Sequence, residues 1–209
     1  IDAVMKNGGL LPLSDVPLLS NEEFRQQVLR SLGEGAEVSA LFGSDGSQGN
    51  VRVYSVLSWA NRGNLSVLST DVCGQYPSLA TDSAKVHLFE RELAEQWRIE
   101  PVGHPWLKPV RFQTPNCEGR DIWLNQSVPP TCGVTDYYQI AGKETHGVAV
   151  GPVHAGIIEP GHFRFLCHGE TVYHLEISLG YQHRGIERAL VGGPNHRTIH
   201  YAETLAGDT

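Results

Sequence analysis

The residues of this chain that could carry chemistry are mainly histidines in its second half. Eight of the ten histidines lie between His146 and His200. His196 and His200 are four residues apart, so a helix would place both on one face, with Glu203 one turn further along. Such a face could bind Zn²⁺. A half-exposed polar helix face explains the same spacing and is the simpler interpretation.

Cysteines and the common cofactor motifs give no further site. The four cysteines, Cys73, Cys117, Cys132 and Cys167, form no C-x-x-C pair, which predicts reduced thiols rather than a disulfide framework. A four-cysteine metal site has no spacing in its favour. The sequence also lacks a G-x-S-x-G elbow, a Walker loop and a G-x-G-x-x-G dinucleotide motif. We therefore expect this chain to bind no cofactor by itself.

Composition and charge exclude some classes of partner. The chain has 16 Lys and Arg against 23 Asp and Glu, a formal charge of −7, and 40% hydrophobic residues. These values are typical of a globular protein. A net acidic chain argues against nucleic acid as a partner, because phosphate binding needs clustered Lys and Arg. No apolar run reaches the roughly 18 residues of a membrane span, and no secretory signal is visible.

The first half of the chain predicts an α+β domain. Residues 1–20 are interpreted as an extended lead-in, after which Asn21 is expected to cap a helix over residues 22–32. Alternation and Gly/Asn/Asp turns predict a three-stranded antiparallel meander over Val38–Phe42, Val51–Ser58 and Leu65–Ser69. A second helix is expected over Ser83–Arg98, with Val86, Phe89, Leu93 and Trp97 as its buried stripe. The fold class is therefore a small antiparallel sheet with helices on one face.

The second half predicts a smaller segment. We expect a first domain over residues 1–115, a proline-containing linker over 116–140 and a segment over 141–209 with a β-hairpin and a helix. The hairpin joins Phe163–Cys167 to Val172–Leu179 through a turn at 168–171, and the helix covers about Pro194–Leu205. A lone hairpin is marginal in water. Its apolar face therefore needs cover from the first domain, another copy of the chain or further sequence, or the segment will be mobile.

One motif lies near the end of the second expected helix. The string ERELAEQWRIEPVGHPWLKPV contains Glu90, Arg91 and Glu92, then Glu95, then His104 and Lys108. For an isolated E-R-E, a solvated helix end is the simplest interpretation. The longer string resembles the signature of the thirty-kilodalton subunit family of respiratory complex I, and Tyr76-Pro77-Ser78-Leu79 resembles the segment before its helix. The resemblance covers about residues 20–112 and departs from the family at Gln96, where an apolar residue is usual.

A second motif lies in the histidine-rich half. It comprises Gly151-Pro152-Val153-His154, then E-P-G-H-F-R-F from Glu159 and L-G-Y-Q-H-R-G-I-E ending at Glu187. This resembles the start of the forty-nine-kilodalton subunit of complex I and of the large subunit of membrane-bound [NiFe] hydrogenases. The E-P-G-H-F-R-F string is more similar to the hydrogenases of the formate hydrogenlyase type. In that group the thirty- and forty-nine-kilodalton parts can be fused in this order. Two motifs in the order of the fused subunit support this resemblance more strongly than either motif alone.

The second resemblance implies roles for particular residues. His154 is the candidate for quinone or proton contact, Arg184 for tuning a nearby iron–sulfur cluster held by another subunit, and His183 and Glu187 are weaker candidates for the same network. Complex I proteins carry a second histidine where this chain has Ile158. Related hydrogenases place two nickel-binding cysteines where Ala206 and Thr209 stand here, so no metal ligand pair is expected.

Together these resemblances predict a subunit of an NADH:quinone oxidoreductase-like or hydrogenase-related complex. It would dock the cytoplasmic arm of the complex. It would be a peripheral protein on the cytoplasmic side of the inner or cell membrane. Other subunits would hold the iron–sulfur clusters, and quinone would bind in the complex. The isolated chain is expected to be inactive. One alternative is a non-catalytic relative kept for architecture or ion-pump coupling. Another is an unrelated metal-dependent enzyme built on the histidines.

Overall fold

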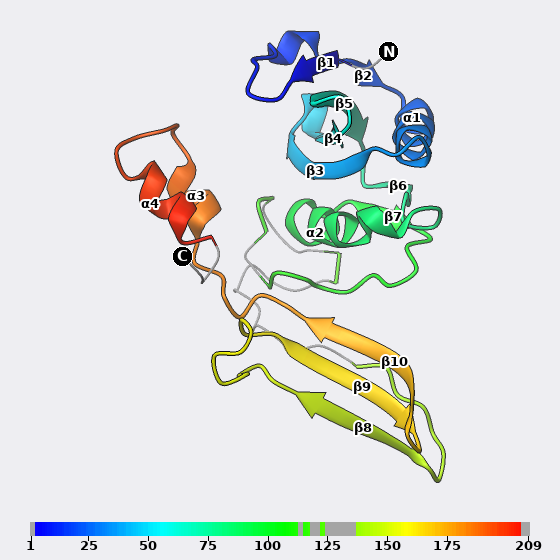
Figure 1. Ribbon diagram of the computed structural model, residues 1–209. Helices are drawn as coiled ribbons and strands as arrows, with labels where there is room; N and C mark the ends of the chain where they lie inside the picture. Colours follow the sequence, from blue (N-terminus) through cyan, green and yellow to red (C-terminus); the bar gives the residue numbers. More distant parts are fainter. Residues whose placement is uncertain (1–2, 113–114, 118–121, 124–136, 206–209) are drawn as a thin grey trace. The chain divides into compact units, whose positions relative to one another are not determined.

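The computed structural model describes residues 3–112, 115–117, 122–123 and 137–205. The chain divides into two compact units, Ile1–Pro130 and Thr131–Thr209, each described by itself below (Figure 1). Both units combine antiparallel strands with a few helices, so the fold class is α+β as the sequence predicts. The expected linker over 116–140 lies largely outside the described residues.

The first unit is built on a five-stranded sheet. Three strands form the predicted meander, β3 (Glu37–Asp45), β4 (Val51–Trp59) and β5 (Asn64–Val72). The extended lead-in expected over residues 1–20 supplies two further strands. Strand β1 (Ala3–Lys6) pairs antiparallel with β5, and the short β2 (Leu18–Leu19) pairs with β5 in parallel. Two short segments, β6 (Gln75–Pro77) and β7 (Glu100–Val102), form a separate parallel pair.

Helix α1 (Asn21–Gly33) begins one residue earlier than the sequence predicts. Its N-cap is Ser20, whose hydroxyl accepts from the Glu23 amide, while the Glu23 carboxylate accepts from the Ser20 amide at 3.0 Å. This reciprocal capping box satisfies two amides that the first helical turn leaves without partners. Asn21 is already helical, and its side-chain oxygen accepts from Thr70 of β5 at 2.8 Å. The cap therefore also ties the start of α1 to the sheet.

Helix α2 (His87–Trp97) follows a short 3-10 helix (Ala84–Val86) and ends at Arg98, which is left-handed. Both α1 and α2 pack on one face of the sheet. Most of the side chains in their shared core are apolar: Phe24, Val28, Leu32, Leu41, Val53, Leu57, Leu68, Val72, Val86 and Leu93. Close approach of α2 to β3 requires Gly43, since a Cβ there would lie 2.6 Å from the Trp97 ring.

The second unit holds a three-stranded antiparallel sheet. The predicted hairpin is confirmed as β9 (His162–His168) and β10 (Thr171–Ser178), and β8 (Thr145–Val150) adds a third strand on the other side of β9. The sequence pattern did not predict β8, because glycine and histidine interrupt its alternation. A register shift between Val172 and His174 breaks the regular pairing of β9 with β10.

Two short helices follow the sheet. They are α3 (Ile186–Leu190) and α4 (Thr198–Glu203). The single helix expected over 194–205 is therefore shorter, and α3 precedes it. Across the described ranges, no helix combines the length and the apolar character that crossing a bilayer requires.

Candidate functional site

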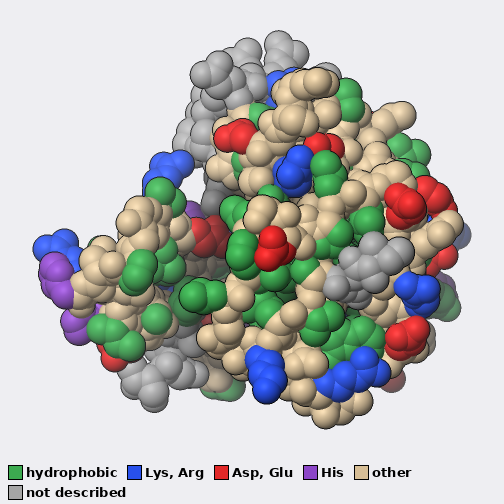
Figure 2. All heavy atoms as spheres, turned by 90° about the horizontal axis from the view of Figure 1, so that it is seen from above, with side chains coloured by type: hydrophobic (Ala, Val, Ile, Leu, Met, Phe, Trp, Pro, Cys, Tyr) green, Lys and Arg blue, Asp and Glu red, His purple; other side chains and the backbone are tan. Residues whose placement is uncertain are grey.

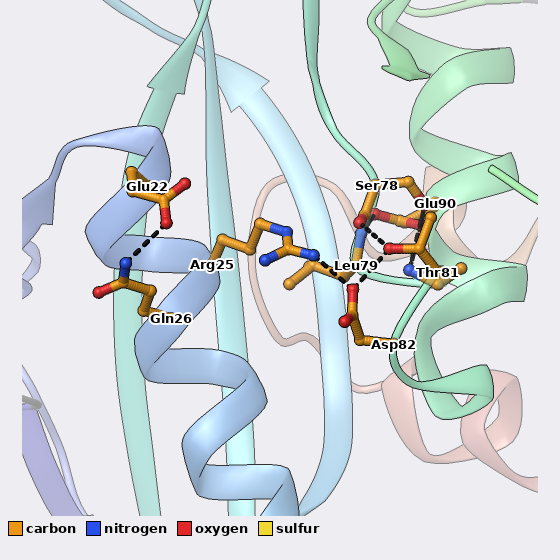
Figure 3. Close-up of polar contacts among 9 residues, drawn as sticks. Glu22, Arg25, Gln26, Ser78, Leu79, Thr81, Asp82 and Glu90 are labelled. Carbon is orange, nitrogen blue, oxygen red and sulfur yellow. Dashed lines mark hydrogen bonds and ion pairs between the residues drawn. The ribbon is translucent and has the colours of Figure 1, made fainter. Parts of the chain in front are cut away.

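The E-R-E motif lies on α2, and its first acid is completely buried. The Glu90 side chain is 0% exposed. Its Oε2 accepts from the Ser78 hydroxyl at 2.6 Å and from the Ala80 amide at 3.0 Å, and its Oε1 accepts from the Leu79 amide at 2.7 Å (Figure 3). Burial raises the pKa of Glu90 above its ordinary 4.5, and these hydrogen bonds oppose the rise. The carboxylate therefore acts as the anchor of the 78–80 turn.

The same turn is tied to α1 through an ion pair. The Arg25 guanidinium contacts Asp82, which also accepts from the Thr81 hydroxyl at 2.6 Å (Figure 3). The Thr81 hydroxyl lies 2.9 Å from the Ser78 carbonyl as well. These contacts link α1 to the turn that Glu90 holds. The Glu90 bonds to Ser78 and Leu79 join the Y-P-S-L segment to the E-R-E helix.

The opposite side of α2 is covered by the segment that follows β7. Arg91 donates from Nε to the Lys108 carbonyl at 2.7 Å and from a terminal nitrogen to the Pro109 carbonyl at 2.8 Å. Its guanidinium also lies 5.4 Å from the centre of the Trp106 ring. The solvated helix end considered for this motif is therefore wrong for Arg91, which is 5% exposed.

Glu95 fixes the end of that covering segment. It is 1% exposed, and its carboxylate accepts from the backbone amides of Val110, Arg111 and Phe112, at 3.3 Å for Val110 and 2.9 Å for Arg111. A carboxylate that binds successive amides in this way stabilises an otherwise irregular backbone. Glu92, the third residue of E-R-E, is partly exposed and pairs with Arg111 at 3.2 Å.

His104 closes the network as a neutral ring. Its Nδ1 accepts from the Trp106 amide at 3.0 Å, so its Nε2 carries the proton and donates to the His87 carbonyl at 3.1 Å. Burial lowers the pKa of His104 below its ordinary 6.5; the hydrogen bond to the His87 carbonyl opposes this shift, and the charge of Arg91 adds to it. The signature residues thus form a positioning network around α2. Each of its acids and its histidine is hydrogen-bonded within the protein.

In the second unit, His154 is held by the loop between β8 and β9. Its Nε2 lies 2.7 Å from the Gly161 carbonyl, so that nitrogen is the donor, and its ring meets Phe163 edge-on at 5.6 Å. Gly151 has a φ of +83°, and a Cβ there would lie 2.2 Å from the Gly161 carbonyl oxygen. The G-P-x-H motif therefore needs its glycine to bring these groups together.

His183, Arg184 and Glu187 lie after β10, at the start of α3, and all three are exposed. Arg184 donates to the Thr204 carbonyl at 2.9 Å. Among the described residues, no hydrogen bond, ion pair or ring contact joins His154 to any of these three. The two halves of the motif do meet elsewhere, because the Gln182 amide nitrogen, turned toward Glu159, lies 3.3 Å from its Oε1. Sequence reasoning did not single out this pair.

The histidines of the hairpin do not form a metal site. The register shift in β10 places His174 opposite Leu166, and therefore on the same face as His162 and His168. Regular alternation predicts a scatter over both faces, which is wrong for this reason. His162 pairs with Ser178, at the far end of the sheet from His168. Within the described part of the chain, no group of three His, Cys, Asp or Glu side chains could hold a metal ion.

Of the remaining sequence-predicted positions, two lie outside the described residues and two are on or before α4. Ala206 and Thr209, expected at the positions of nickel ligands, lie outside the described residues. His200 Nδ1 lies 3.3 Å from Glu203 on α4, and His196 is exposed in the preceding turn. On the face viewed in Figure 2, described Lys and Arg side chains stand singly or in small groups among acidic and apolar ones.

The chain is similar to two subunits of hydrogenase-type oxidoreductases. Formate hydrogenlyase subunit 5 of Escherichia coli (strain K12) is 29% identical over 178 residues, covering 74% of this chain and 30% of the relative. Hydrogenase-4 component G of the same organism is 25% identical over 122 residues, covering 54% of this chain and 22% of the relative. No family model matches the chain. These similarities show homology to oxidoreductase subunits, of which the chain spans less than a third.

The larger match is not confined to one unit. The first unit holds 130 of the 209 residues, which is less than 74% of the chain. A match that covers 74% must therefore include residues of both units. One relative thus aligns with parts of this chain on either side of the unit boundary.

Proposed function

We propose that the chain is a subunit of a complex I-like, hydrogenase-related oxidoreductase complex, where it docks the peripheral arm on the cytoplasmic side of the membrane. The observation that carries this proposal is that one match, to formate hydrogenlyase subunit 5, includes residues of both units. A chance match to one motif would not extend across two separate compact units. The order of the two motifs also agrees with a fused thirty- and forty-nine-kilodalton arrangement.

The first unit is suited to docking by its rigidity. Glu90, Arg91 and Glu95 fix the backbone on both sides of α2 without opening a cleft. Both helices cover one face of the sheet, which leaves the other face for a partner. On that face Phe42 of β3 stacks on Tyr54 of β4 at 5.5 Å and remains 47% exposed. We infer that this face contacts a neighbouring subunit.

The second unit carries an apolar face of its own. The register places Phe165 of β9 between Val148 and Leu175, and Phe163 between Val150 and Ile177. The side chains of these valines, leucine and isoleucine are each about 40% exposed. The segment Tyr137–Tyr138 packs on the opposite face instead, as shown by the Tyr138 amide bond to Glu176 at 2.9 Å. The apolar face therefore supports docking within a larger assembly.

His154 fits a proton-transfer role better than a simple quinone anchor. With Nε2 donating to the Gly161 carbonyl, a neutral ring offers only an acceptor at Nδ1. Only the protonated ring could donate to a quinone carbonyl, whereas the neutral ring could accept from a quinol hydroxyl. Ile158, at the position of the second complex I histidine, is 52% exposed and supplies no donor. The quinone would bind in the complex, and other subunits would hold the iron–sulfur clusters. Arg184 would tune the nearest cluster through its charge.

A second candidate function is a non-catalytic relative that has lost the nickel site. Ala206 and Thr209 favour it, since alanine cannot ligate a metal and threonine is a poor substitute for a thiolate. Such a subunit would keep the docking surfaces and contribute to architecture or to ion-pump coupling.

The test is purification of the native complex through a tag on the protein that contains this chain, followed by mass spectrometry and metal analysis. We expect cluster-bearing oxidoreductase subunits to copurify, with iron and without nickel. Ile177→Asp should weaken copurification, whereas Thr171→Asp, which adds the same charge at an exposed position of β10, should not. Recovery without any redox subunit would contradict both functions. Stoichiometric nickel would contradict the expected loss of the nickel site, on which the second function rests.

A further inference from the structure

An open cavity of about 210 Å³ lies in the first unit between α1 and the turn that joins β4 to β5. It is lined mostly by polar side chains. Those used below are Gln27, Arg30, Glu34, Trp59, Arg62 and Asn64. None of them belongs to the signature network around α2. The cavity is therefore independent of the proposed function and is not explained by it.

One wall of the cavity is formed by the Trp59 ring, on which the Arg62 guanidinium stacks. The Trp59 side chain is 8% exposed, and its Nε1 donates to the buried Ser66 hydroxyl at 3.2 Å. The Arg62 guanidinium lies 4.5 Å from the centre of the Trp59 ring, a distance at which cation–π attraction holds the group in place. Arg62 is exposed, and the partner that it stacks on is uncharged.

The second cation comes from α1. Arg30 donates to the side-chain oxygen of Gln27, which is again an uncharged partner. None of the ion pairs among the described residues includes Arg30 or Arg62. In a chain with a formal charge of −7, two arginines that line one cavity without a carboxylate partner stand out. Glu34 is the single acid among the residues that line it.

The geometry points to a binding site for a small oxyanion. Arginine presents its N–H groups as a planar fork that matches carboxylate and phosphate oxygens. Here two such forks, from α1 and from the β4–β5 turn, line one cavity, and Asn64 adds an amide at its wall. The volume of about 210 Å³ is below the roughly 300–1,000 Å³ of pockets for drug-sized ligands. We therefore propose that Arg30 and Arg62 together bind a free carboxylate or phosphate group on a molecule of few heavy atoms.

NMR titration of the 209-residue chain tests this proposal. Inorganic phosphate and succinate are added separately, at constant ionic strength held with sodium chloride, while the Arg Nε–H signals and the Trp59 Nε1–H signal are followed. We expect saturable shifts with a dissociation constant in the millimolar range. Saturation by phosphate alone assigns a phosphate group, by succinate alone a carboxylate, and by both an oxyanion of either kind. Shifts that do not saturate with either probe would overturn the site.

Variants separate a built site from general charge attraction. Arg30→Ala and Arg62→Ala should each weaken binding by about tenfold or more, because each removes a charge-assisted pair of hydrogen bonds. Arg62→Lys keeps the charge without the fork and should fall between Arg62→Ala and the wild type. Glu34→Gln should tighten binding, since it removes the one opposing charge. Arg25→Ala, on the same helix but paired with Asp82, is the matched control and should bind as the wild type does. Equal affinity of Arg62→Ala and the wild type would show that the cavity is not an oxyanion site.

Discussion

Removing the buried Glu90 carboxylate should destabilise the first unit more than any change to a surface acid. In Glu90→Ala, the Leu79 amide and the Ser78 hydroxyl lose their acceptor in a site with no exposure at position 90, whereas the Ala80 amide keeps the Ser78 oxygen. Each buried donor left without a partner costs about 1–3 kcal/mol. Relief from burying a charge offsets part of that sum. We expect the free energy of unfolding to fall by about 2–4 kcal/mol, since two such donors lose their partner and the relief from burying the charge lowers the total.

Glu90→Gln should be milder, for a reason that the hydrogen-bond geometry supplies. Its amide oxygen can still accept from Leu79, and its amide nitrogen can donate to a reoriented Ser78 hydroxyl. Ala80 retains a second acceptor, because its amide also lies 3.1 Å from the Ser78 oxygen. The expected loss is about 1–2 kcal/mol, at the lower end of the range for one weakened buried hydrogen bond.

Urea titration followed by tryptophan fluorescence measures these losses directly. All four tryptophans lie in the first unit, so the signal does not include unfolding of the second unit. Glu22→Ala is the matched control: Glu22 is an exposed acid on α1 that accepts from Gln26, and its removal should cost less than about 1 kcal/mol (Figure 3). If Glu90→Ala lost no more than this control, the carboxylate would not anchor the turn and the interpretation of the motif would be refuted.

Three further changes test other parts of the first unit with the same titration. Leu93→Ala, at a side chain 1% exposed in the shared core, should cost about 2–5 kcal/mol; a loss under about 1 kcal/mol would place Leu93 outside the core. Ser20→Ala removes the capping box with Glu23 and should cost about 0.5–2 kcal/mol, whereas an unchanged midpoint would mean that α1 does not depend on its cap. The His104 pKa is lowered in the folded state, so the folded chain binds fewer protons than the unfolded chain as pH falls through the ordinary value of 6.5. Its stabilising contribution is thus present above that pH and is lost below it, as the bond from the Trp106 amide breaks. The decline below about pH 6.5 should be shallower in His104→Gln; parallel slopes for variant and wild type would assign the decline to other groups.

Much of the fold follows from patterns that are local in the sequence. The meander was predictable because alternating side chains and intervening turn residues act between neighbours along the chain. The apolar stripe of α2 was predictable for the same reason, since Val86, Leu93 and the partly buried Phe89 and Trp97 repeat with helical period. The hairpin also needed only its two flanking runs and the turn between them.

Other features depended on distant partners that no local pattern records. The pairing of β1 and β2 with β5 joins residues about fifty or more positions apart, and neither short strand has enough alternation to be recognised by itself. The register shift at Val172 and His174 moved one histidine to the other face of the sheet, because a bulge reverses the side on which the following residues point. The cap of α1 fell on Ser20, since its hydroxyl reaches the Glu23 amide.

The candidate site also has features that the sequence determines and features that depend on the tertiary structure. The sequence by itself determined which residue types recur together: the acids and the arginine of E-R-E, His104 beyond them, and the G-P-x-H motif with its glycine. Only the tertiary structure decided what these groups do. It turned Glu90 into a buried acceptor for the 78–80 turn and aimed His154 at the Gly161 carbonyl. The reason is that a side chain's type is encoded at one position, whereas its burial and its hydrogen-bond partners are set by segments that meet only when the chain is packed.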